Sequence, residues 1–231
     1  MNYLINYSDQ RYFRSQMLNT KTGYNIAGFD FVYCYNRAQI DSAFYNKNHK
    51  ILDCPRGAGY WLWKPYFLYK TIMNEEILEG DTIFYSDAGA YFEKDLSPYF
   101  HKTRERNIVL FDMPYFTNNQ WVKRDAFVLM DCDNKEYSEG SHWNGAFMIF
   151  KKCKESVDFI SEYLKWCQDE RIISDNPNEC GKDNYFEFED HRHDQSVLSL
   201  MAIKHKIQPE LDLSQWGMKE DSYIHHSRDP R

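Results

Sequence analysis

Apolar residues along the chain alternate between short strand-like runs and longer stretches with helical spacing. The short runs are rich in β-branched and aromatic residues, which is typical of β-strands. They cover residues 3–5, 29–34, 82–85, 107–111 and 146–150. After the first run, Ser8 and Asp9 offer an N-cap for a helix through Met17, and a polar helix is expected at 38–45.

Two later stretches repeat apolar residues every three or four positions, as amphipathic helices do. The first contains Val157, Ile160, Leu164 and Cys167, broadened by Phe159, Tyr163 and Trp166, and the second contains Val197, Leu198, Met201 and Ala202. Strands that alternate with helices predict an α/β fold with a mostly parallel central sheet flanked by helices. We expect one domain over residues 1–231.

Ligands of open α/β sheets collect at the carboxyl ends of the strands. The residues that follow the predicted strands are therefore the first candidates for a site: 6–8, 86–89 and the neighbours of Ala146. The polar stretch 174–190 contains Pro177 and Gly181, and we expect a loop there that can close over such a site.

Composition narrows the classes of function. The 231 residues include 28 Lys+Arg and 35 Asp+Glu, a net charge of −7 that argues against a nucleic-acid binder. A hydrophobic content of 42% excludes wholesale disorder, and an aromatic content of 17% is suited to binding sugars or bases. Apolar runs stay well short of the roughly 20 residues of a transmembrane helix, so we expect a cytoplasmic protein.

The six cysteines show no C-x-x-C spacing. In a chain of this length they indicate reduced, buried thiols, rather than a disulfide framework or a zinc site.

The segment 83–89 ends an apolar strand with the carboxylate of Asp87, followed by Ala88 and Gly89. A carboxylate in this position can hold a hard divalent cation or a ribose hydroxyl. It can equally cap the next turn, and the segment alone does not decide between these roles.

In the segment 56–66, Arg56 precedes two glycines and Lys64 follows them, directly before the predicted start of a helix at Pro65. A helix N-terminus flanked by cations is suited to an anion. The alternative is a turn whose aromatic rings, Trp63 among them, belong to the core.

The segment 189–196 gathers two histidines, one arginine and three carboxylates at the start of an amphipathic helix. Asp194 is expected in the first turn, where it can serve as a cap, accept a proton or bind a sugar hydroxyl. For His191 and His193 we expect exposure to solvent.

Three weaker signals complete the candidates. Asn144 and Gly145 precede a buried strand and can bind sugar hydroxyls or form an ordinary turn. Arg124 and Asp125 belong to a segment, 121–125, that is expected to open a helix. The last signal is a pair of adjacent histidines, 225 and 226, of which at most one is expected to be a ligand.

Taken together, these segments resemble small GT-A-type glycosyltransferases of capsule, lipopolysaccharide and large-virus glycan synthesis. The most specific are G-Y-W-x-W-K-P, ending at Pro65, and Y-x-D-A-G, ending at Gly89. The other matching segments are 4–8, 28–30, 80–81, 123–125, 144–145 and 193–195.

The resemblance implies a GT-A-like, Rossmann-related fold and a polysaccharide-biosynthesis transferase. Its donor would be a UDP-, GDP- or dTDP-sugar, and its metal would be Mn²⁺ or Mg²⁺. Its acceptor would be an oligosaccharide or a lipid-linked glycan. A lipid-linked acceptor would bring the protein to the membrane surface. The usual D-x-D metal motif is replaced by Asp87-Ala88-Gly89. A second metal ligand would then come from elsewhere, for example His225 or His226, or the diphosphate and water would hold part of the metal's coordination.

The resemblance also implies roles for residues. Asp194 and Asp87 are the expected catalytic groups, and Asp87, His225 and His226 the expected metal ligands. The expected donor-binding residues are Tyr7, Ser8, Arg56, Gly59, Trp63, Lys64, Ser86, Ala88, Arg124, Asp125, Asn144, Gly145 and Arg228.

Two other functions remain open on the sequence. A metal-dependent phosphoesterase would use Asp87, His191, His193, Asp194 and His225. A non-catalytic carbohydrate-binding protein would account for the aromatic content.

Overall fold

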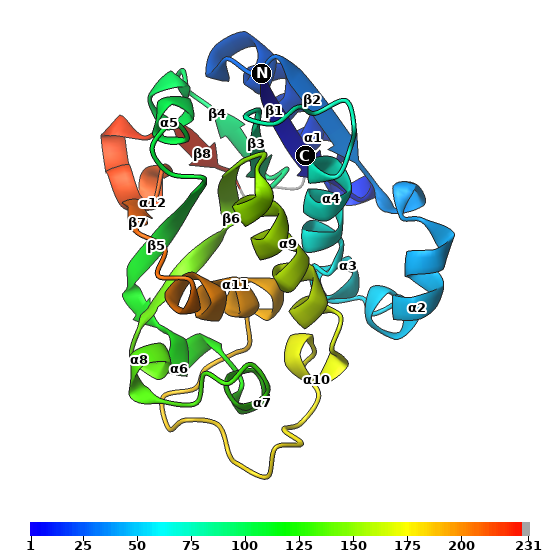
Figure 1. Ribbon diagram of the computed structural model, residues 1–231, viewed down its shortest axis with the longest axis vertical. Helices are drawn as coiled ribbons and strands as arrows, with labels where there is room; N and C mark the ends of the chain where they lie inside the picture. Colours follow the sequence, from blue (N-terminus) through cyan, green and yellow to red (C-terminus); the bar gives the residue numbers. More distant parts are fainter. Residues whose placement is uncertain (228–231) are drawn as a thin grey trace.

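A computed structural model describes residues 1–227 of the chain and has a six-stranded sheet at its centre, with helices on both faces (Figure 1). The strand order is β2-β1-β3-β6-β5-β7. These strands are β1 (Asn2–Tyr7), β2 (Phe31–Tyr35), β3 (Thr82–Ser86), β5 (Ile108–Thr117), β6 (Ser141–Lys151) and β7 (Pro209–Leu211). Only β6 runs against its neighbours, so the predicted mostly parallel α/β sheet is confirmed.

A separate two-stranded sheet joins distant parts of the chain. Strand β4 (Ala90–Phe92) pairs antiparallel with β8 (Ile224–His226). This pairing brings the end of the described chain next to the residues that follow β3.

The helices differ widely in length, and several consist of a single turn. The α-helices are α1 (Phe13–Thr22), α2 (Ser42–Leu52), α3 (Gly57–Tyr60), α4 (Trp63–Ile72), α5 (Ser97–Lys102), α6 (Asn118–Trp121), α7 (Arg124–Leu129), α8 (Lys135–Ser138), α9 (Lys154–Cys167), α10 (Glu170–Ile173), α11 (His193–Lys204) and α12 (Gln215–Met218). Shorter or wider turns are η1 (Gln10–Tyr12), η2 (Gly23–Ala27), η3 (Arg37–Gln39) and η4 (Lys219–Asp221). None of the helices described is long and apolar enough to cross a bilayer.

The sheet separates two apolar cores. Successive side chains of a strand point to opposite faces, so Ile83 and Tyr85 of β3 enter the larger core and Phe84 enters the smaller one. The larger core also contains the apolar faces of α4, α9 and α11. The side-chain pattern of β3 therefore directs Tyr85 towards α4.

The predicted strands are all present, whereas three local predictions are wrong. The polar helix expected at 38–45 is instead the short η3 followed by α2, because Ile40 and Asp41 are extended and Asp41 accepts a hydrogen bond from the Tyr66 hydroxyl. The segment 121–125 does not open one helix: Val122 is extended and separates α6 from α7.

The third error concerns the cysteines. All six are free, but only Cys132 and Cys167 are buried, and Cys34 is exposed on the edge strand β2. The N-cap prediction for the first helical segment is correct, since Asp9 accepts hydrogen bonds from the backbone N–H groups of Arg11 and Tyr12.

Candidate functional site

A buried lysine joins the two carboxylates that the sequence selected. The Lys64 side chain is 4% exposed, and its Nζ lies 2.9 Å from Asp194 Oδ2 and 3.5 Å from Asp87 Oδ1. The same ammonium donates a hydrogen bond of 2.8 Å to the Gly145 carbonyl. The start of α4, the end of β3, strand β6 and the start of α11 therefore meet at one cation.

An unusual turn leads the chain into α4. All five residues from 57 to 61 have positive φ, including the non-glycine residues Ala58, Tyr60 and Trp61. Left-handed backbone is unfavourable for residues with a Cβ, and such conformations persist where surrounding structure holds them. At Gly59, an added Cβ would lie 2.7 Å from the Leu52 Cα, so this position also requires glycine for packing. The turn fixes where α4, and hence Lys64, begins.

The rings of this turn pack against the start of α11. His193 has a φ of 52°, and its ring stacks on Tyr60 and Trp61 with centroids 4.8 and 5.4 Å apart. Its Nδ1 lies 2.8 Å from the Ile173 carbonyl. Two strained segments thus support each other and set Lys64 opposite Asp194.

The predicted exposure of His191 and His193 is wrong, because both rings are buried. His191 bridges the Ile172 carbonyl and the backbone N–H of Lys123. Burial lowers the pKa of both histidines, so they are neutral near pH 7.

Asp87 is the accessible member of the group. Its side chain is 36% exposed, and its Oδ1 accepts a 2.5 Å hydrogen bond from the Tyr85 hydroxyl. Its backbone is held by a hydrogen bond to the Ala146 carbonyl of β6 and another from the N–H of Ala90. The contacts to Tyr85 and Lys64 both use Oδ1, so Oδ2 is the oxygen available to a ligand.

The electrostatics of the buried pair favour a charged lysine. Burial alone would lower the pKa of Lys64, but the charges of Asp194 and Asp87 outweigh it and raise that pKa. Burial raises the pKa of Asp194 despite the opposing effect of Lys64 and a hydrogen bond from the Tyr163 hydroxyl. A carboxylate held in this way is a stronger base than one in water.

Asn144 and Gly145 position β6 against α11. The Asn144 side chain donates to Asp212 and accepts from the N–H of Ala146. A Cβ on Gly145 would lie 3.1 Å from the Gln195 Cβ, so glycine permits the close approach that places the Gly145 carbonyl on Lys64.

The expected donor-binding residues at the end of β1 are buried. Tyr7 stacks on Trp63 with ring centroids 3.8 Å apart, and the Ser8 hydroxyl donates to Gln16. Ser86 accepts a hydrogen bond from Asn19, and Ala88 is buried in the turn after β3.

The sequence analysis did not predict a chain of buried, hydrogen-bonded amide side chains next to the carboxyl ends of β1 and β3. Asn19 of α1 donates to Ser86 and to the Ala90 carbonyl on either side of Asp87. Asn19 accepts from Asn6, which in turn accepts from Gln16. The spacing of Gln16 and Asn19, three residues apart on one helix face, was the available signal.

Arg56, Arg124 and Asp125 hold the loop of residues 174–190 instead of contacting Asp87. Arg56 forms ion pairs with Asp175 and Asp190. Arg124 forms an ion pair with Asp133 and lies over the Tyr185 ring. Asp125 accepts hydrogen bonds from the backbone N–H groups of Glu179 and Cys180.

This loop lines a cavity of about 320 Å³ that is open to solvent. Its lining residues are Arg56, Lys123, Asp175, Asn176, Pro177, Asn178, Asn184, Phe188, Asp190 and His191. The Asp175 carboxylate lies 3.8 Å from His193 Nε2, and His193 directly precedes Asp194. The cavity therefore lies near the start of α11, which carries Asp194.

A divalent cation would find one carboxylate here. The β4–β8 pairing sets His226 opposite Ala90 and His225 opposite Tyr91, and Ser227 donates to the Gly89 carbonyl. Within residues 1–227, no three His, Cys, Asp or Glu side chains form a ready metal site. Mg²⁺ is commonly held by one or two carboxylates and substrate phosphates, so Asp87 fits such an ion. Arg228 lies outside the described residues.

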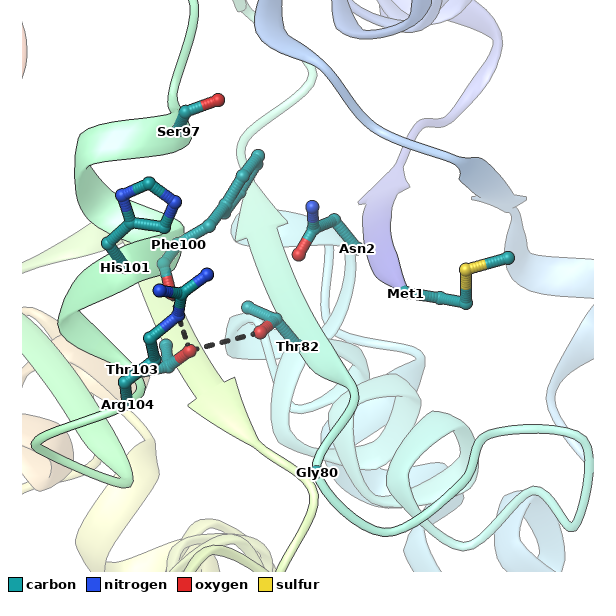
Figure 2. Close-up of a pocket in the computed structure, with 9 residues that line it drawn as sticks. All are labelled: Met1, Asn2, Gly80, Thr82, Ser97, Phe100, His101, Thr103 and Arg104. Atoms are coloured by element: carbon teal, nitrogen blue, oxygen red, sulfur yellow. Dashed lines mark hydrogen bonds between the residues drawn. The ribbon is translucent and has the colours of Figure 1, made fainter.

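Figure 2 shows a second hollow, of about 240 Å³, lined by Asn2 and Thr82 together with His101, Thr103 and Arg104. Asn2 and Thr82 begin β1 and β3, whereas the carboxylate Asp87 follows the end of β3. Thr82 and Ser86, the first and last residues of β3, are four positions apart, which is roughly 13 Å along a strand. This hollow therefore belongs to the opposite edge of the sheet.

Two solved structures with a similar fold are glycosyltransferases. The apo form of mouse xyloside xylosyltransferase 1 aligns with a TM-score of 0.56 and 11% identity over 99% of this chain and 98% of its own. The apo structure of the bifunctional glycosyltransferase WbbM aligns with a TM-score of 0.56 and 8% identity over 97% of this chain and 45% of its own. Neither protein-family models nor curated protein sequences match the chain. The expected GT-A-like fold is confirmed.

Proposed function

We propose that this chain is a glycosyltransferase that moves a sugar from a nucleotide-sugar donor to a hydroxyl of a glycan acceptor. The observation that carries the proposal is the Lys64 ammonium between Asp87 and Asp194, on a fold shared with glycosyltransferases. A partly exposed carboxylate beside a buried carboxylate suits a reaction that handles a diphosphate on one side and a hydroxyl on the other.

Asp87 is proposed to face the donor diphosphate. Its Oδ2 would hold Mn²⁺ or Mg²⁺, with His225 or His226 of β8 as a second ligand and the diphosphate as the remainder. The cation would neutralise charge on the leaving diphosphate. Tyr85 and Lys64 keep the Asp87 carboxylate in one orientation by contacting its other oxygen.

Asp194 is proposed to bind a sugar hydroxyl. In transfer, the bond from the sugar C1 to the diphosphate oxygen breaks and a bond from C1 to the acceptor oxygen forms. In an inverting reaction the acceptor proton would pass to Asp194, whose raised pKa suits a base. Lys64 acts as a positioning residue, because its N–H groups are directed to Asp194, Asp87 and the Gly145 carbonyl.

The cavity lined by the loop of residues 174–190 is proposed as the acceptor site. Two cations and two carboxylates line it, Arg56 and Lys123 with Asp175 and Asp190, so its fixed charges balance. Asparagine side chains and the Phe188 ring supply polar contacts and one apolar surface, which suits an uncharged sugar.

Phe188→Ala tests this placement of the acceptor. We expect the acceptor KM to rise about tenfold while hydrolysis of the donor without acceptor is unchanged. Phe186→Ala is the matched control, because the Phe186 side chain is fully exposed two residues away. An equal rise in both variants would contradict the acceptor site.

The function itself is tested with a panel of UDP-, GDP- and dTDP-sugars in the presence of Mn²⁺. We expect one donor to raise the melting temperature and to release its nucleoside diphosphate slowly. A shift with free glycans alone would indicate a carbohydrate-binding protein, and hydrolysis of phosphodiesters would indicate a phosphoesterase. Either result would overturn the proposal.

A further inference from the structure

Helix α1 buries uncharged polar side chains and exposes two of its apolar ones. Gln16 and Asn19 are buried, whereas Phe13 and Met17 are 56% and 58% exposed. Exposed apolar residues that lie together on one face are a feature of interaction sites. The inward face is occupied by the amide contacts to Ser86 and Ala90, so the outward face is available to a partner.

The outward residues form one stripe. Positions 13, 17, 21 and 24 follow the helical repeat, and they carry Phe13, Met17, Lys21 and Tyr24, all exposed. Arg14 lies beside Phe13 on the same side. We call these five residues, four of α1 and Tyr24 of η2, the α1 outer face; the Tyr24 hydroxyl also accepts a hydrogen bond from the N–H of Val32 in β2.

The charge of this face differs from that of the whole protein. Residues 10–29 contain Arg11, Arg14 and Lys21 and no Asp or Glu, although the chain has a net charge of −7. Arg11 lies 3.9 Å from Asp9, and neither Arg14 nor Lys21 has an ion-pair partner among residues 1–227. A local excess of positive charge within an acidic protein is complementary to an anionic surface.

We propose that the α1 outer face binds the surface of an anionic phospholipid membrane. Phe13 and Met17 would enter the headgroup boundary, and Arg14 and Lys21 would contact lipid phosphates, as in interfacial helices whose basic residues flank an apolar stripe. The inner face of α1 bonds the residues on either side of Asp87, and a helix is about 10 Å across. A membrane on the outer face therefore lies close to the candidate site.

Sedimentation of the full chain with lipid vesicles tests the proposal. We expect binding to vesicles that contain phosphatidylglycerol, and at least about tenfold weaker binding to pure phosphatidylcholine vesicles. The double variant Phe13→Ser/Met17→Ser and the double variant Arg14→Glu/Lys21→Glu should each lose at least about tenfold in the bound fraction. Melting curves verify that each variant folds.

Matched controls change the same residue types elsewhere. Tyr115→Ser/Phe186→Ser removes two exposed rings outside α1, and Lys47→Glu/Lys50→Glu reverses two exposed lysines of α2. Both should bind vesicles as the unaltered chain does. Equal losses in the controls, equal binding to both kinds of vesicle, or a dimer in solution that Phe13→Ser/Met17→Ser dissolves would each overturn the proposal. The test does not depend on transferase activity, so it stands apart from the proposed function.

Discussion

Two buried lysine–aspartate pairs lie in this molecule, and they differ in what surrounds the carboxylate. Lys64 is 2.9 Å from Asp194, and Lys123 is 3.5 Å from Asp125. Asp125 accepts hydrogen bonds from the backbone N–H groups of Glu179 and Cys180. Asp194 instead accepts from one hydroxyl, that of Tyr163.

The pKa directions follow from this difference. Burial alone would raise the pKa of Asp125, but the backbone N–H groups and Lys123 outweigh it and lower that pKa. Burial lowers the pKa of Lys123, whereas neighbouring carboxylates raise that of Lys64. The Asp125 carboxylate is saturated by backbone donors and fixes the loop. In Asp194, the contacts to Tyr163 and Lys64 both use Oδ2, which leaves Oδ1 for a ligand. The first pair is suited to chemistry and the second to structure.

Asp194→Asn should produce the largest effect. It removes the proposed base while an amide of the same shape can still accept from Tyr163, so transfer should fall by about a thousandfold with donor affinity retained. Initial rates and calorimetric titration of the donor nucleotide check this. Loss of nucleotide affinity with an equal loss of rate would move Asp194 to the donor side.

Lys64→Met should produce the next largest effect. Compared with Lys123→Met, it shows how much each lysine–aspartate pair contributes to the stability of the fold. It leaves Asp87 and Asp194 without their shared cation, so the free energy of unfolding should fall by about 3–5 kcal/mol. Lys123→Met should lower it by about 1–2 kcal/mol, because Asp125 keeps its backbone donors. Urea denaturation of both variants measures the difference. Equal losses would show that the pairs are equivalent.

Asp125→Asn should destabilise the loop by about 2 kcal/mol, since an amide cannot accept all the backbone hydrogen bonds at once. The folded fraction should keep near-normal transfer with a saturating acceptor. Hydrogen exchange at Glu179 and Cys180 should quicken. A loss of transfer as large as that of Asp194→Asn would place Asp125 in the reaction.

Acidification should lower the stability of the region around Lys123 and Asp125, by less than the substitutions above. His191 is neutral when folded because burial lowers its pKa, and its ring accepts from the N–H of Lys123. The unfolded histidine binds a proton below pH about 6.5, so stability is lost as pH falls, and the share of His191 is about 1 kcal/mol between pH 7 and 5.5. Melting temperature against pH for the wild type and for His191→Gln checks this. The same slope in both would exclude His191 as the cause.

Removal of divalent metal tests the Asp87 end alone. Chelation should abolish transfer yet leave the melting temperature within about 2 °C, because the fold holds Asp87 through Tyr85 and Ala146 without a metal. Full activity after chelation would remove the metal from the proposal.

The structure brings together three of the residues that the sequence selected, Lys64, Asp87 and Asp194, and each of them lies at a recognisable junction between a strand or turn and a helix. The sequence placed Asp125 among the donor-binding residues and could not show that Asp125 holds a loop, since that depends on backbone N–H groups 54 and 55 residues away. Arg56 was likewise expected at an anion, but its partners come from a loop more than a hundred residues later. The inverted polarity of α1 was missed because amphipathic patterns are normally taken to bury the apolar face.

The left-handed turn at 57–61 has a consequence for synthesis of the protein. The ring that stacks on it, His193, is made more than a hundred residues later, so a nascent chain that ends before α11 lacks the support for this conformation. Residues 57–61 would then relax to ordinary right-handed backbone, and α4 would begin elsewhere. Lys64 is therefore set opposite Asp194 only after α11 has been made.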